Sequence, residues 1–142
     1  MIEQKKSYEF KFKQNASYDL SQQDSYETLK KQKDSFLYGD KMTNTFILAM
    51  ALGYKNNAHK KILKPSNSIP TEKFSEGDIW MMVALYMQTK NKNLDALYDA
   101  DKILENAEEY ANGGIDYLYT LYRKSKNPIE DLEAEFRQEL KY

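Results

Sequence analysis

The chain contains no cysteine and only one histidine, His59, among its 142 residues. Without cysteine it can form no disulfide, no thiolate metal site and no cysteine nucleophile, which fits a reducing cytosol. A nucleophilic triad also needs a base beside the nucleophile, and that base is usually histidine. Because His59 lies in a polar stretch, we expect a solvated loop histidine and predict no catalytic residue.

Other familiar signatures are missing as well. The sequence holds no Walker loop, no dinucleotide-binding GxGxxG and no HExxH motif, so we predict neither a cofactor nor an enzyme. No run comes near the roughly 18 apolar residues of a membrane span, and the N-terminus has no apolar signal core. We therefore expect a soluble, cytoplasmic protein. Only two of the 21 basic residues are arginine, which argues against a sequence-specific DNA reader.

The residues that are present suffice for one packed domain. Hydrophobic residues make up 41 % of the chain, and its 12 tyrosines supply apolar area with a polar tip. We predict a mainly α fold, a compact bundle of five to six helices with one short N-terminal β-strand or arm. The arm would span residues 1–23 and the helical core residues 24–142, in a single domain.

The strongest pattern lies between Lys102 and Arg123, where small, apolar and tyrosine side chains recur at steps of three and four. The stripe consists of Ile103, Ala107, Tyr110, Ala111, Gly114, Leu118, Leu121 and Tyr122. Because the stripe stays in phase through Gly113 and Gly114, we predict one continuous helix in which another backbone approaches the glycines. The alternative is that Asn112 and Gly113 end one helix and a second begins after them.

Shorter patterns predict the other elements. Further helices are expected at residues 24–35, at 41–52, at 75–89, from Leu94 and from Pro128. Asp24 and Glu27 have the spacing of a capping box, Gly53 should end the second helix, and Ser75 should cap the third. The third helix holds Trp80 and is apolar nearly all round, so we expect it to be central and to clasp the long helix.

Alternating aromatic and charged residues over 8–13 predict a half-buried strand. Since no second strand is evident, it would pair with a second copy of the chain or lie as an arm across the helices. A strand followed by two helices also occurs in ribbon-helix-helix DNA-binding dimers, in which Lys11 and Lys13 would face DNA. A homodimeric DNA-binding regulator is therefore one alternative function.

Charge is divided unevenly along the chain. Residues 1–64 carry twelve lysines and seven acids, a net charge of +5, and residues 65–142 carry nine bases and fifteen acids, a net charge of −6. Two such halves can neutralise each other within one fold, offer two faces to two partners, or stack head to tail.

Basic residues gather in the stretch between Tyr54 and Thr71, which contains no acid. The candidates for nucleic-acid or anion binding are Lys55, His59, Lys60, Lys61 and Lys64. They would act by neutralising phosphates rather than by reading bases. The alternative is a lysine-rich loop that only aids solubility.

Acidic residues gather along the first half of the long helix. The candidates for a face that meets a basic partner are Asp99, Asp101, Glu105, Glu108 and Glu109. Carboxylates four residues apart share a helix face and could hold a hard cation, which makes a carboxylate metalloenzyme a further alternative. Because the Glu-x-x-His pairs of di-metal bundles are absent, we predict no metal site.

Two stretches, FILAMALGYK at 46–55 and EEYANGGIDYL at 108–118, resemble the signature blocks of a small helical family. These are the DNA phosphorothioation (Dnd) system-associated accessory proteins, found beside genes that replace a backbone oxygen of DNA with sulfur and restrict unmodified DNA. The resemblance implies an accessory role in defence against foreign DNA. We therefore favour a non-enzymatic accessory or adaptor protein that acts by binding protein partners and DNA. The resemblance supplies no catalytic residues.

Overall fold

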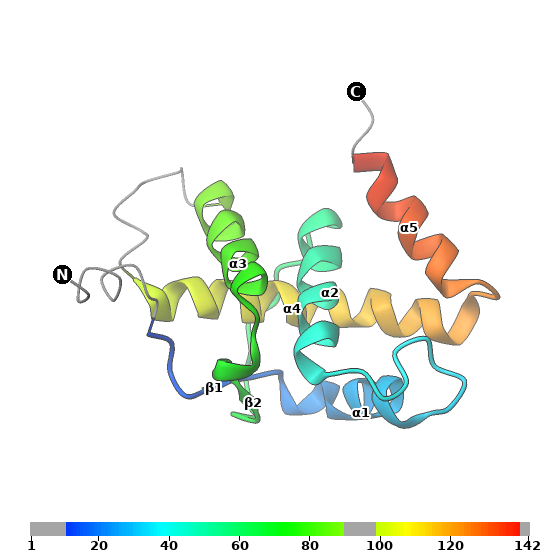
Figure 1. Cartoon of the computed structure of the whole chain (residues 1–142), viewed down its shortest axis with the longest axis horizontal. Coiled ribbons are helices and arrows are strands. Elements are labelled where there is room, and N and C mark those ends of the chain that lie inside the picture. Colours follow the sequence, from blue (N-terminus) through cyan, green and yellow to red (C-terminus); the bar gives the residue numbers. More distant parts are fainter. Residues whose placement is uncertain (1–10, 90–98, 140–142) are drawn as a thin grey trace.

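Helix α4 is the longest element and runs without a break from Ala100 to Lys124. The computed structural model describes residues 11–89 and 99–139. Figure 1 shows α4 lying across the molecule as a long rod, with the other described helices arranged around it. The prediction of one helix through both glycines is confirmed, and the alternative that Asn112 and Gly113 end a helix is wrong.

Close backbone contact explains why α4 contains glycine in its interior. A methyl group on Gly114 would overlap the carbonyl oxygen of Ala49 in helix α2, Met42–Lys55. A methyl group on Gly53 of α2 would overlap the carbonyl oxygen of Tyr110. Neither glycine has a positive φ, so no unusual backbone conformation requires glycine here. The two glycines are required because the helices lie so close together.

Helix α2 ends later than the sequence predicted. Gly53 lies inside the helix, because it is needed where α2 crosses α4, and the expectation that it ends the helix is wrong. Asn56 is the C-terminal cap and its side chain donates to the carbonyl oxygen of Leu52 at 2.9 Å. Asn57 then takes the left-handed conformation, with φ of 56°, which asparagine tolerates better than most residues.

Helix α3, Glu76–Thr89, begins as predicted. The amide of Asp78 donates to the Ser75 hydroxyl and the amide of Ser75 donates to the Asp78 carboxylate, each at 3.0 Å. The expectation that α3 is the central helix is wrong, because Trp80 and Met81 are about half exposed. Instead α2 makes the close crossing with α4, and its face from Phe46 to Leu52 is almost entirely buried.

The first and last described helices flank this crossing. Helix α1, Gln23–Lys31, buries Tyr26 and Leu29. The expected capping box at Asp24 is wrong, because the cap of α1 is Gln22 and a short 3₁₀ turn, η2 (Leu20–Gln22), precedes it. Helix α5, Pro128–Glu139, begins at the predicted proline. The short helix predicted from Leu94 falls mainly on residues outside the described ranges.

The sheet consists of two short antiparallel strands. β1 (Asn15–Ala16) pairs with β2 (Ile69–Pro70), and a 3₁₀ turn, η3 (Thr71–Lys73), follows. Residues 11–13 of the strand predicted over 8–13 are not in a strand, and the rest of that stretch lies outside the described residues. The described N-terminal strand thus pairs within the chain, because the segment between α2 and α3 contains its partner strand, β2.

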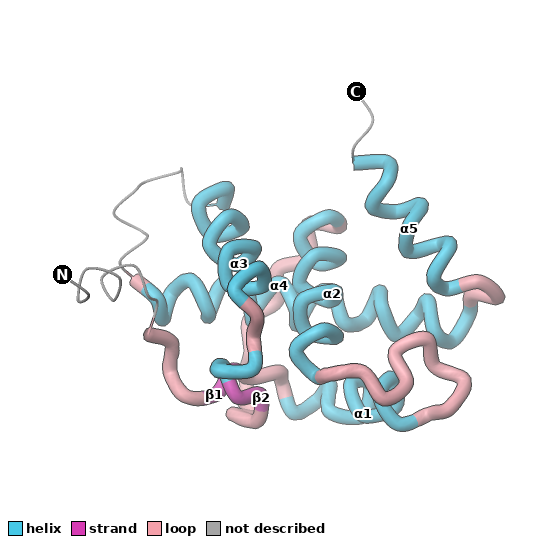
Figure 2. The backbone as a smooth tube through the Cα atoms, viewed as in Figure 1, coloured by secondary structure: helices cyan, strands magenta, loops and turns pink. Residues whose placement is uncertain are grey.

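The elements form layers around α4. Figures 1 and 2 show α2 and α3 crossing in front of α4, α1 lying below it, and the segment after α2 passing behind it. We call that segment, residues 56–68, the connection. The mainly α fold with one short N-terminal strand is confirmed. Within residues 11–89 and 99–139, no helix has the length and apolarity that a membrane crossing requires.

Candidate functional site

The connection lies directly against the middle of α4. The amide of Lys60 donates to the carbonyl oxygen of Glu109 at 3.1 Å. The side-chain amide of Asn112 donates to the carbonyl oxygens of Lys60 and Lys61, at 3.1 and 3.2 Å. The buried Asn112 therefore fixes the path of the connection, which places its basic side chains beside the acids of α4.

Most basic residues of this stretch are paired with acids that lie far along the sequence. The pairs are His59 Nε2 with Glu109 Oε1 at 2.8 Å, Lys60 Nζ with Asp116 Oδ2 at 3.7 Å, and Lys55 Nζ with Glu135 Oε2 at 3.3 Å. The basic stretch and the acidic helix, which the sequence suggested as two separate surfaces, thus meet along part of their length. Their charges partly cancel there.

Lys61 and Lys64 differ from the other basic candidates. Both are exposed, and neither forms an ion pair with any residue in the described ranges. Their carbonyl groups are held, because Lys61 accepts from Asn112 and Lys64 accepts from the amide of Leu20 at 2.9 Å. These two ammonium groups are therefore presented to solvent from a fixed backbone.

The acidic candidates also separate by environment. Asp99 caps α4 by accepting from the amide of Lys102 at 3.2 Å, which is a structural role. Asp101 and Glu105 are exposed on the same side of the helix, four residues apart. Glu109 is half-buried against His59. Asp101 and Glu105 are thus the two candidates that face solvent without a described partner.

Glu108 is a buried carboxylate, only 4 % exposed. It accepts from the backbone amide of Ser17 at 2.7 Å and pairs with Lys13 Nζ at 3.2 Å. Burial raises the pKa of the Glu108 carboxyl, although Lys13 and the Ser17 amide act in the opposite direction. Glu108 therefore attaches the N-terminal segment to α4 and is not part of an exposed acidic face.

Sequence reasoning missed this role, but a signal was present. Leu104, Ala111 and Ile115 lie four residues before, three after and seven after Glu108, and all three are fully or almost fully buried. The carboxylate thus sits in the middle of an apolar stripe, where it needs a partner. Lys13, which the ribbon alternative placed on DNA, is that partner.

The single histidine is held rather than free. His59 contacts the Glu109 carboxylate and packs edge-on against the Tyr110 ring, with centroids 4.7 Å apart. A shallow hollow of about 400 Å³ adjoins it, lined in part by Lys60, Asp116 and Tyr117. Among the described residues, no group of three His, Asp or Glu side chains is arranged to hold a metal ion.

A wider cleft, with a volume of about 760 Å³, lies between α2, α3 and α5. Its lining is mainly apolar and consists of Met50, Ala51, Tyr54, Lys55, Asn57, Met81, Ala84, Leu85, Gln88 and Phe136. Tyr54 is 41 % exposed and Met81 45 %, and the neighbouring Trp80 is 51 % exposed. Large apolar side chains gathered in this way are typical of binding surfaces.

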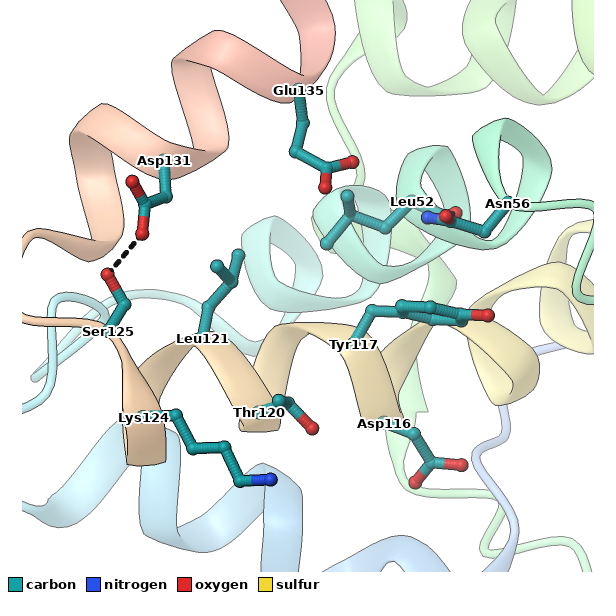
Figure 3. Close-up of a pocket in the computed structure, with 10 residues that line it drawn as sticks. All are labelled: Leu52, Asn56, Asp116, Tyr117, Thr120, Leu121, Lys124, Ser125, Asp131 and Glu135. Carbon is teal, nitrogen blue, oxygen red and sulfur yellow. Dashed lines mark hydrogen bonds between the residues drawn. The ribbon is translucent and has the colours of Figure 1, made fainter.

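A second cleft, of about 480 Å³, lies on the other side of α5 (Figure 3). Leu52, Tyr117 and Leu121 supply its apolar wall, and Asp116, Thr120 and Lys124 point away from α5 along α4. None of the described residues of α5 is fully buried, so this helix stands between two clefts. The Lys55–Glu135 ion pair links it to the end of α2.

Comparison with curated proteins and comparison with solved structures each found no match. A comparison with protein families did find one. Residues 20–142, which include all the described helices, match the family described as DNA sulphur modification system-associated protein 4, and the resemblance seen in the sequence is confirmed. The chain belongs to this family of proteins associated with a DNA sulphur modification system.

Proposed function

We propose that this chain is a non-enzymatic accessory protein that binds another protein of the DNA sulphur modification system and brings it to DNA. Membership of the family supports the association with such a system. The observation that carries the protein-binding part is the apolar cleft between α2, α3 and α5, in whose lining Tyr54 and Met81 are half exposed.

The partner that best fits this cleft is an amphipathic helix. Three helices border the cleft, and flexible Met50 and Met81 line it, which lets one surface adapt to the apolar stripe of a fourth helix. Helix α5 carries five acids and one base, a net charge of −4. The partner helix should therefore carry lysine or arginine beside its apolar stripe.

Only two residues of each charged surface suggested by the sequence remain candidates for binding a partner. Lys61 and Lys64 are the members of the basic stretch that are open to an anionic partner, because the other candidates face carboxylates. Asp101 and Glu105 are the exposed acids open to a basic partner. Both assignments remain predictions.

The test is co-purification of the full-length chain with each protein encoded in the DNA sulphur modification system. Met81→Glu places a charge in the cleft and should abolish capture of the partner. Leu63→Glu is the matched control, because Leu63 is 79 % exposed in the connection and lines none of the clefts described above. Trp80 is the only tryptophan in the chain, so its fluorescence should shift to shorter wavelength when the partner binds. Undiminished capture by Met81→Glu would remove the proposal.

A further inference from the structure

A second basic surface lies at the ends of α1 and α4. It contains six basic residues: Lys30, Lys31, Lys33, Arg123, Lys124 and Lys126. We call this surface the basic ridge. Residues 30–34 and 119–127 together contain these six bases and one acid, Asp34, a net charge of +5. Since the whole chain has a net charge of −1, the remainder carries −6, and positive charge is concentrated here.

The fold joins the two halves of the ridge, which are about 90 residues apart in sequence. The Tyr122 hydroxyl donates to the Asp34 carboxylate at 2.8 Å. The loop after α1 folds back, because the amide of Gly39 donates to the carbonyl oxygen of Lys30 at 2.8 Å. Figure 1 shows the C-terminal ends of α1 and α4 on the same side of the molecule. Lys33 therefore lies beside the segment that carries Arg123.

Helix stability accounts for only part of this charge. Cations in the last turn of a helix interact favourably with its dipole, which explains Lys30 and Lys31 in α1 and Arg123 and Lys124 in α4. Lys33 and Lys126 lie beyond the helix ends, and both are exposed. Neither forms an ion pair with any residue in the described part of the chain. These two lysines are thus not needed for the fold as it is described.

The ridge is more strongly positive than the connection. The connection and the end of α2 supply four lysines, but the carboxylates of Glu109, Asp116 and Glu135 face this stretch, which leaves +1. On the ridge, Glu27 pairs with Lys31 at 3.8 Å and Asp34 accepts from Tyr122. Asp131 also lies against the ridge, because it accepts from the hydroxyl of Ser125, which stands between Lys124 and Lys126. Counting these three acids, the six bases still leave +3. The electrostatic potential therefore favours an anion at the ridge.

From this arrangement we infer that the basic ridge binds the phosphate backbone of duplex DNA without reading its sequence. Lysine dominates the ridge, and lysine acts as a point charge suited to phosphate neutralisation. Lys33 and Lys126, the two lysines that helix stability does not explain, line none of the described clefts. Lys124 lines the second cleft beside Leu121, so the comparison with polyglutamate below separates DNA from an acidic protein partner. The inference rests on the proposed function, which names DNA as a target, but it places the DNA contact on the basic ridge and not on the connection.

The test is the affinity of the full-length chain for a labelled duplex of about 20 base pairs, measured between about 50 and 200 mM salt. Lys33→Gln with Lys126→Gln should weaken binding for all sequences alike and reduce the salt slope by about 2, one for each lost phosphate contact. Lys61→Gln with Lys64→Gln removes the same charge from the connection, which is the competing candidate for the anion. The inference expects this variant to leave the salt slope for DNA unchanged. Thermal unfolding of both variants should match that of the natural chain.

Three results would overturn the inference. The first is loss of DNA binding in the Lys61 and Lys64 variant but not in the ridge variant, which moves the contact to the connection and leaves the proposed function intact. The second is equal loss in both variants. The third is binding of polyglutamate as tight as binding of DNA. None of these depends on the cleft, because capture of the protein partner is tested separately with Met81→Glu.

Discussion

Gly114 of α4 lies so close to the carbonyl oxygen of Ala49 in α2 that no side chain fits between them. The two helices therefore meet backbone to backbone. Helix α4 tolerates a glycine in its interior, which costs about 1 kcal/mol relative to alanine, because the close crossing offsets that cost. This contact is the centre of the described fold, and its consequences can be measured.

Replacing Gly114 should lower the free energy of unfolding. In Gly114→Ala the added methyl group meets the backbone of Ala49 and Gly53, so the helices must separate, and we expect a loss of about 1 to 3 kcal/mol or more. Gly77→Ala is the control. Its methyl group would meet only the Ser75 hydroxyl at 3.8 Å, and helix propensity should stabilise α3 by up to about 1 kcal/mol. Urea unfolding of both variants checks the opposite signs, and similar stabilities would contradict the close crossing.

The buried Glu108 should make stability depend on pH. Because its pKa is raised in the folded protein, the folded state holds this proton more tightly than the unfolded state. The contribution of this proton to the free energy of unfolding is therefore fully present below the ordinary carboxyl pKa, and it is lost as pH rises through the raised pKa. In Glu108→Gln this dependence should vanish, whereas Glu109→Gln, at a half-buried neighbour, should retain it.

Unfolding of both glutamate variants would be followed by circular dichroism from acidic to neutral pH. If the difference in unfolding free energy between the natural chain and Glu108→Gln does not change over that range, Glu108 does not titrate as described. Glu108→Ala should be destabilised at every pH, because the amide of Ser17 then loses its acceptor.

Tyr26 offers a test of an unpartnered buried hydroxyl. The side chain is fully buried and stacks on Tyr18 with ring centroids 4.7 Å apart, but its hydroxyl has no hydrogen-bond partner among the described residues. Tyr26→Phe removes that polar group and should raise the free energy of unfolding by about 1 kcal/mol. Tyr122→Phe, which removes a hydroxyl that donates to Asp34, should lower it. A loss of stability in Tyr26→Phe would show that the hydroxyl has a partner.

The reciprocal cap of α3 should be cooperative. Ser75→Ala and Asp78→Ala each remove one of two hydrogen bonds of 3.0 Å, and each should cost about 1 kcal/mol. A double-mutant cycle measures their coupling through thermal unfolding. We expect the double variant to lose less unfolding free energy than the two single variants lose together, since each side chain positions the other. Strict additivity would mean that the two bonds act independently.

Signals confined to a few neighbouring residues predicted several of the helices correctly, although the capping box expected at Asp24 was wrong. The helix start at Ser75 and the start of α5 at Pro128 follow from cap residues whose partners lie within one turn. The unbroken α4 follows from a stripe that keeps its phase across the glycines. These features depend on local geometry, so a sequence is sufficient to find them.

Features set by distant contacts were not predicted. Gly53 looked like a helix end because its other use, making room for Tyr110, depends on a helix more than fifty residues away. The pairing of Lys60 with Asp116 depends on the path of the connection, which Asn112 fixes. A charged stretch in a sequence does not reveal which of its charges are already matched within the fold.

The adjacent Gly113 extends the account of α4 in one further way. Its missing side chain makes room for the carbonyl oxygen of Ala58, just after α2 ends, while Gly114 makes room for Ala49 within α2. The continuous segment from Ala49 to Ala58 thus contacts the middle of α4 at two adjacent positions. The middle of α4 can separate from this segment only if both contacts break together, so its amide protons should exchange with solvent as slowly as any in the protein.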